Sequence, residues 1–158
     1  MNDVKDYKIC EDNIIRRRVG SKWNPACPNH LLQPLLEKLQ DNGSLSYADD
    51  LLYGQCILSL IEIVLNNKHF KLQTDEIKDE CRGEMLKDVL VNCPKTFDRT
   101  KGSTAYSYCF RTCYTAGIHV LERFNIMREL LEYTDYSNEC NEFTNLNVEE
   151  VIEDGFCS

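Results

Sequence analysis

Long apolar stretches are missing from this chain of 158 residues. The longest, from Cys56 to Leu65, has about half of the roughly 20 residues that a membrane-spanning helix needs, and it contains Glu62. Met1 to Asp6 also lack the basic and then apolar pattern of a secretory signal peptide. We therefore expect no membrane span and no signal peptide.

Proline and glycine are scarce, with four and seven residues, and internal repeats and strand-type alternation are absent. Apolar residues make up 42% of the chain, which is too many for a wholly disordered protein. A chain of this length has room for one sizeable hydrophobic core. These features predict one compact domain of the all-α class.

Cysteine is frequent, with nine residues, but no two of them form a Cys-x-x-Cys pair. A zinc site of four thiolates therefore has little support, and the odd count leaves one thiol over in any disulfide framework. We expect free, buried thiols in a reducing cytosol. Cys27 and His30 form a Cys-x-x-His pair that lacks two further ligands, and whether this pair binds a metal stays open.

Apolar residues at helical spacing predict four helices, over about 29–41, 46–66, 74–94 and 105–132. Asn29 and Thr74 are the expected N-caps of the first and third helices, and Pro94 is the expected end of the third. The first 28 residues show no clean period. The expected organisation is an N-terminal arm (1–28), a helical domain (29–132) and an acidic tail (133–158).

Charge is distributed unevenly along the chain, whose net charge is −8. The segment from Lys95 to Arg111 has four bases against one acid, whereas nine acids and no base follow from Glu129 onward. This asymmetry indicates a basic working surface followed by an acidic tail. A chain of this net charge cannot hold DNA tightly by counterion release alone, so something else must contribute if it binds DNA.

The fourth predicted helix is rich in aromatic residues. Its expected core stripe comprises Phe110, Cys113, Gly117, Val120, Leu121 and Phe124. Another side of the helix has Tyr108, Arg111, Thr115 and His119. Aromatic residues at helical spacing are often core, but aromatic side chains beside bases are also what single-stranded DNA requires for base stacking and phosphate contacts.

Phe97 to Gly102, then Tyr108 and the helix through Arg123, resemble conserved region 2 of bacterial sigma factors. The chain is more similar to the small late sigma factors of T4-type bacteriophages. It shares their Phe-Asp-x-Thr-Lys loop, the Tyr eleven residues after Phe97, and a Cys-aromatic-x-Ala run at Cys113–Ala116. The resemblance covers about 29–124 and is strongest over 97–116. It implies a helical domain like sigma region 2.

The resemblance also implies three binding surfaces. The residues expected to contact promoter DNA are Lys95, Arg99, Lys101, Tyr106, Tyr108, Phe110, Arg111, Thr112, Thr115 and His119. The residues expected to face the clamp coiled coil of RNA polymerase are Glu80, Glu84, Lys87 and Asp88, with an ordinary solvated helix face as the alternative. The residues expected to dock on a DNA sliding clamp are Val148, Val151, Ile152 and Phe156, with a disordered solubilising tail as the alternative.

The chain departs from the housekeeping sigma factors in three ways. Arg111 and Thr112 replace the paired Trp that follows the Tyr in those factors, and Pro94 lies where they continue the helix. No basic helix-turn-helix follows Phe124, so a region that reads a −35 element is missing. We therefore expect recognition of a short, AT-rich −10-like element, whose base steps unstack easily.

These observations predict a non-enzymatic phage late sigma factor that acts in the cytoplasm of the infected bacterium. It would bind host core RNA polymerase and late promoters, with the sliding clamp and a late co-activator as further partners and with no cofactor. The alternative is a helical polymerase-binding adaptor, such as an anti-sigma factor or co-activator, that does not contact DNA. An enzyme is disfavoured, because no G-x-S-x-G, P-loop or H-E-x-x-H motif occurs and the three histidines are scattered.

Overall fold

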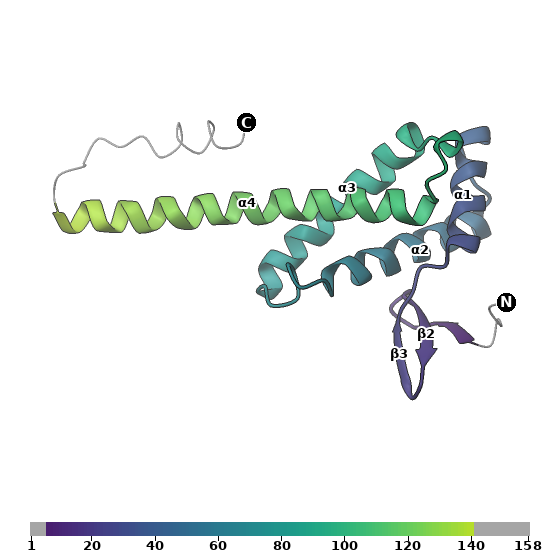
Figure 1. Ribbon diagram of the computed structural model, residues 1–158, viewed down its shortest axis with the longest axis horizontal. Coiled ribbons are helices and arrows are strands. Elements are labelled where there is room, and N and C mark those ends of the chain that lie inside the picture. The colour runs from purple at the N-terminus through teal and green to yellow at the C-terminus, as the bar shows by residue number, and fades with distance from the viewer. Residues whose placement is uncertain (1–5, 141–158) are drawn as a thin grey trace. The chain divides into compact units, whose positions relative to one another are not determined.

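The computed structural model describes the backbone of residues 6–140 and the side chains of residues 6–132. Residues 1–117 form one unit and residues 118–158 a second, so the boundary between them falls within the last helix. The elements are β1 (Tyr7–Ile9), β2 (Ile15–Val19), β3 (Lys22–Pro25), α1 (Asn29–Asn42), α2 (Tyr47–Leu65), α3 (Asp75–Thr96), the short 3-10 helix η2 (Arg99–Lys101) and α4 (Ala105–Cys140) (Figure 1). The fold is mainly helical.

A three-stranded antiparallel sheet precedes the helices, so the expectation of an all-α fold with an irregular arm is wrong for residues 7–25. The strands lie in the order β1-β2-β3, and Val19 pairs with Lys22 across a two-residue turn. Gly20 in this turn has a φ of 66°, which favours glycine. A Gly-Ser pair between two strand-forming segments is a known hairpin signal. In β2, however, three successive arginines interrupt the alternation of apolar and polar residues that would indicate a strand.

The sheet is attached to α2 through Ile15 and Ser59. Ile15 is buried, and its backbone N–H donates to the Ser59 Oγ at 2.7 Å. The Ser59 hydroxyl donates in turn to the Gln55 carbonyl at 2.6 Å, so the buried serine has both a donor and an acceptor partner. The sheet is therefore part of the folded domain.

The core of residues 1–117 is built around α2. Its largest buried side chains include Ile57, Leu60 and Val64, and α1 contributes Leu32 and Leu36. From α3 the buried side chains are Cys81, Met85, Val89 and Cys93. α2 is buried on several sides because it is apolar over most of its circumference.

The helices α1, α2 and α3 begin close to the predicted residues, but the predicted N-cap of α1 is wrong. Ser46 caps α2 and Thr74 caps α3 through side-chain oxygens that accept backbone N–H groups. Asn29 is the exception, because α1 begins at this residue and Pro28 occupies the N-cap position. The Asn29 side chain instead caps α4, since its Oδ1 accepts the Tyr106 N–H at 3.0 Å.

The prediction that Pro94 ends the third helix is wrong, because α3 continues through Pro94 to Thr96. Two interactions support this last turn. The Thr96 hydroxyl donates to the Asn92 carbonyl at 2.8 Å, and the Gln40 amide donates to the carbonyls of Pro94 (3.1 Å) and Phe97 (2.7 Å). Gln40 thus satisfies carbonyls that a helix end leaves unpaired. α4 also extends beyond the predicted residue 132, to Cys140.

Candidate nucleic-acid interface

The buried side of α4 is made of small residues. Ala105, Cys109, Cys113 and Ala116 are buried, and a Cβ added at Gly117 would lie 2.5 Å from the Met85 side chain. Small side chains allow α4 to lie close to α3 and to Phe70. The predicted core stripe is correct for Cys113, Gly117 and Val120. It is wrong for Phe110, Leu121 and Phe124, which are only half-buried.

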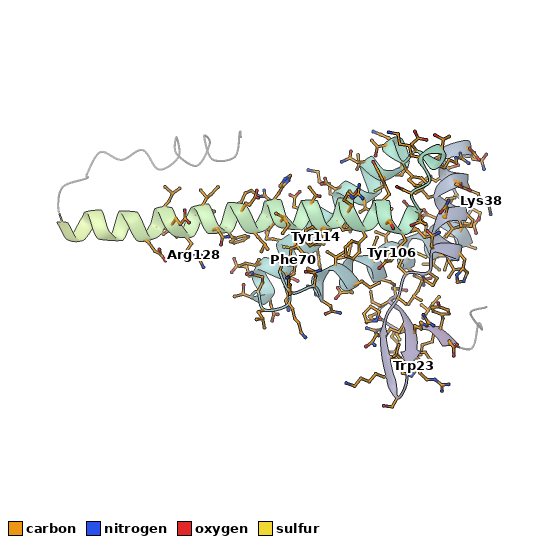
Figure 2. The ribbon with its side chains drawn as sticks, in the orientation of Figure 1. Trp23, Lys38, Phe70, Tyr106, Tyr114 and Arg128 are labelled. Carbon is orange, nitrogen blue, oxygen red and sulfur yellow. The ribbon has the colours of Figure 1, made fainter. Side chains whose placement is uncertain are left out.

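Tyr106, Phe110 and Tyr114 form an aromatic row along one edge of α4. They recur every four residues, so their side chains lie on the same side of the helix. The ring centroids of Tyr106 and Phe110 are 6.0 Å apart, and those of Phe110 and Tyr114 are 6.5 Å apart with nearly parallel planes. All three side chains are half-exposed. Figure 2 shows Tyr106 and Tyr114 on the same side of the helix.

The row lines a hollow of about 500 Å³, and Ser107 and Arg111 complete its wall. Phe70 holds one end of the row in place. Its ring is fully buried and meets the Tyr114 ring edge-on, with centroids 5.7 Å apart (Figure 2). Aromatic rings that are held by the core on one side and exposed on the other can stack with a planar base. Arg111 beside them can contact the phosphate of such a base.

Tyr108 lies on the other flank of α4, away from the aromatic row. Its ring packs on Phe97 with a centroid distance of 5.5 Å, and its hydroxyl donates to Thr96. Thr112, one turn later, donates to the Tyr108 carbonyl at 3.1 Å and accepts a weak hydrogen bond from the Cys93 thiol. Tyr108 and Thr112 therefore join α4 to the end of α3, and the structure separates Tyr108 from Tyr106 and Phe110.

The loop that carries the sigma-like motif is held in place by a buried side chain, hydrogen bonds and an ion pair. Phe97 is buried, and the Asp98 carboxylate accepts hydrogen bonds from the backbone N–H and the hydroxyl of Thr100. These hydrogen bonds lower the pKa of Asp98. Arg99 forms an ion pair with Asp41 of α1. Lys95 and Lys101 remain exposed at either end of the loop.

The remaining residues that we expected to contact DNA lie on the outer side of α4. Arg111 and Thr115 are exposed between the two aromatic flanks. His119 is also exposed, in the unit that begins at Ile118. Within residues 1–117 the residues that we expected to contact DNA therefore fall into two groups. One is the aromatic row with Arg111, and the other is Tyr108 with Lys95 and Lys101.

The residues expected to bind RNA polymerase lie on α3. Glu80, Glu84 and Lys87 are on the side away from its core side chains, whereas Asp88 lies near the buried Cys93. Glu80 and Lys87 are exposed, and Glu84 and Asp88 are half-exposed. Val91, one turn after Lys87, is 49% exposed and adds an apolar centre to this charged face. The residues expected to dock on a sliding clamp, Val148, Val151, Ile152 and Phe156, lie outside the described residues.

None of the seven cysteines whose side chains the structure describes forms a disulfide, and six of them are buried. Burial raises the pKa of Cys113, and a hydrogen bond with Cys56 together with burial raises the pKa of Cys27. Cys27 is buried whereas His30 is exposed, with its ring against Tyr7. Across residues 6–132, no group of three or more His, Cys, Asp or Glu side chains could hold a metal ion.

Sequence reasoning gave no role to Tyr114 or to the basic residues of the sheet. The spacing of Tyr106, Phe110 and Tyr114 was the available signal for Tyr114, because residues four apart share one side of a helix. For the sheet, the signal was the run Arg16–Arg18 followed by Trp23.

No protein-family model, curated protein or solved structure matches this chain. The likeness to sigma region 2 thus rests on the residues of the loop and of α4. In the part of the chain that the structure describes, no helix is both long enough and apolar enough to cross a membrane.

Proposed function

We propose that the chain is a non-enzymatic sigma-type initiation factor of a T4-type bacteriophage. It binds the core RNA polymerase of the host in the bacterial cytoplasm and directs initiation at short, AT-rich −10-like elements. The observation that carries the proposal is the half-exposed aromatic row on α4 with Arg111 beside it. Stacking on aromatic rings tolerates any base and stabilises separated strands by about 1–3 kcal/mol per base.

The sigma-like loop supports the same proposal. Lys95 and Lys101 are exposed on a segment that Gln40 and the ion pair of Arg99 hold against α1. Basic side chains on a rigid loop can fix the register of a DNA backbone, because the loop does not lose conformational entropy when it binds. In this proposal the loop positions phosphates and the aromatic row receives unpaired bases.

Polymerase binding explains how an acidic chain reads DNA. The core enzyme supplies most of the electrostatic attraction to DNA, so a net charge of −8 does not prevent base recognition by this chain. The charged side of α3 around Glu80 and Lys87 is the proposed polymerase-binding surface. The acidic tail from residue 133 is the proposed clamp-binding peptide.

The second candidate is a polymerase-binding adaptor without DNA contacts. The exposed apolar residues Leu90 (45%) and Val91 (49%) among the charges of α3 favour a protein partner for that helix. An adaptor, however, gives no reason for half-exposed aromatic side chains that line a hollow on α4.

Transcription by bacterial core polymerase on supercoiled DNA with a TATAAATA-like element tests the proposal. We expect initiation at that element only when the chain is present. Tyr106→Ala is expected to lower initiation roughly tenfold or more, because one stacking surface is lost. Its matched control is Tyr47→Ala, which removes a tyrosine that is 86% exposed on α2, outside the aromatic row.

Polymerase binding is measured in parallel by co-purification. Retained binding with lost initiation in Tyr106→Ala supports the sigma-type function. Polymerase binding by the wild-type chain without initiation on any AT-rich template would favour the adaptor, and equal effects of Tyr106→Ala and Tyr47→Ala would contradict the role of the row.

A further inference from the structure

The two sides of the N-terminal sheet present different basic residues. Directly paired residues share a side, so Tyr7, Arg17 and Asn24 form one row across the three strands. Side chains alternate along a strand, so the neighbouring arginines Arg16 and Arg18 lie on the opposite side. The run of three arginines is therefore divided between two surfaces.

On the side opposite Arg17, Arg16 and Lys8 have partners within the sheet and its turn. Arg16 forms a two-pronged ion pair with Asp12, at 2.9 and 2.7 Å, and this pair lowers the pKa of Asp12 to about 2. Lys8 lies over the Trp23 ring, 4.2 Å from its centroid. These contacts are within the sheet and its turn.

Arg17 lies at a second hollow, of about 350 Å³, between the sheet and the helices. Tyr7, Val19 and Asn24 line the hollow from the sheet, and Tyr106 lines it from α4. Tyr106 also lines the hollow of the aromatic row, so the two hollows meet at this ring. Figure 2 shows Tyr106 on the side of α4 that faces the sheet.

Arg17 is exposed, and its guanidinium lies over the Tyr7 ring at 5.9 Å. A guanidinium that rests on a ring keeps its N–H groups at the edge, where they can donate to a phosphate. From Tyr114 to Arg17 the surface thus presents three aromatic rings and then a cation. This order fits a strand whose bases stack on the rings while its phosphates reach the charge.

We propose that single-stranded DNA on the aromatic row continues over Tyr106 into the sheet hollow, where Arg17 binds a phosphate. The inference rests on the proposed function for the identity of the strand as promoter DNA. Duplex DNA does not fit this path, because its bases are stacked on one another and cannot reach the rings. An acidic peptide would satisfy Arg17 but would leave the row without a use.

The test compares Arg17→Ala with Arg18→Ala in the full chain. Both variants remove one exposed arginine from β2, but from opposite sides of the sheet. Binding of a fluorescent 12-residue oligo-dT is followed by anisotropy over a range of salt concentrations. Arg17→Ala is expected to weaken binding about tenfold and to reduce the slope of log K against log salt by about 0.7, the value for one phosphate on a single strand. Arg18→Ala is expected to stay within about twofold of wild type.

Phe110→Ala and Arg17→Lys complete the set. Phe110→Ala should weaken binding with little change in salt slope, whereas Arg17→Lys should retain the slope. Equal effects of Arg17→Ala and Arg18→Ala would overturn the inference, as would absence of oligo-dT binding by the wild-type chain. Equal affinity for a duplex, or equal displacement of oligo-dT by polyglutamate, would also overturn it.

Transcription with core polymerase separates this inference from the proposed function. Normal initiation by Arg17→Ala together with unchanged oligo-dT binding would remove the sheet contact and leave the sigma-type function standing. Oligo-dT binding that depends on Arg17, without any initiation, would support the sheet contact and contradict the sigma-type function.

Discussion

Ser59 shows how a single polar residue decides the position of the sheet. It lies among buried apolar side chains of α2, and its exposed fraction is 0%. Its hydroxyl oxygen accepts the backbone N–H of Ile15 in β2 at 2.7 Å. A buried N–H without a partner costs about 1–3 kcal/mol, so this contact favours the docked sheet strongly over a detached one.

Ser59→Ala is therefore expected to lower the free energy of unfolding by about 1–3 kcal/mol. Urea denaturation followed by circular dichroism measures the change. Ser21→Ala, in the exposed turn of the hairpin, is the control and should stay within about 0.5 kcal/mol of wild type. A loss at Ser59 no larger than at Ser21 would mean that the sheet is not held through this hydroxyl.

At the scale of the element, the position of α4 depends on the absence of a side chain at Gly117. A Cβ there would lie 2.5 Å from Met85 Cε and 2.7 Å from the Phe70 ring. The Met85 side chain can yield, but Phe70 is buried and supports Tyr114. Added volume at Gly117 would therefore disturb both the core and the aromatic row.

Gly117→Ala is expected to destabilise the fold by about 1–3 kcal/mol through overpacking, despite the better helix propensity of alanine. Gly83→Ala is the matched control on α3, because nothing lies within 4 Å of the Cβ that it adds. This exposed helical site should gain up to about 1 kcal/mol. Thermal unfolding of both variants measures the difference, and a stabilised Gly117→Ala variant would contradict the close packing of α4.

The helices were largely predictable, whereas the sheet and the arrangement of the site were not. Ser46, Thr74 and the apolar periods mark α2 and α3 because capping and periodicity are local properties. β1 and β3 have three and four residues, too few to show a period, and their stability comes from pairing and from Ser59. The packing of Tyr108 on Phe97, and of Phe110 between Tyr106 and Tyr114, could not be predicted, because sequence spacing does not reveal which flank of a helix a neighbouring side chain covers.

At the scale of the whole molecule, the cysteines report on the integrity of residues 1–117. Six of the seven described thiols are buried there, and only Cys10 is half-exposed. Burial removes these six thiols from contact with solvent reagents. It also raises the pKa of Cys113, and a protonated thiol is a poor nucleophile. Reaction at these sites thus requires the unit to open.

Reaction with a disulfide reagent at pH 8 measures this opening. In a variant with Cys140→Ser and Cys157→Ser, we expect Cys10 to react quickly and the six buried thiols on the order of a thousandfold more slowly, as for global unfolding at about 5 kcal/mol. The slow group should react together when urea unfolds the chain. Rapid modification of all seven thiols in the absence of urea would contradict the packed core.

The first turn of α4 is capped by side chains from α1, and this has a consequence for the order in which the chain assembles during its synthesis. Asn29 and Gln33 accept the N–H groups of Tyr106 and Ala105, which follow them by 77 and 72 residues. Closing a loop of this length is entropically costly, so the start of α4 is set after the other helices of the unit have met. The aromatic row is then among the last surfaces to form on a newly made chain. A fragment that lacks the first 33 residues would keep every residue of the row and lose the two amides that begin its helix.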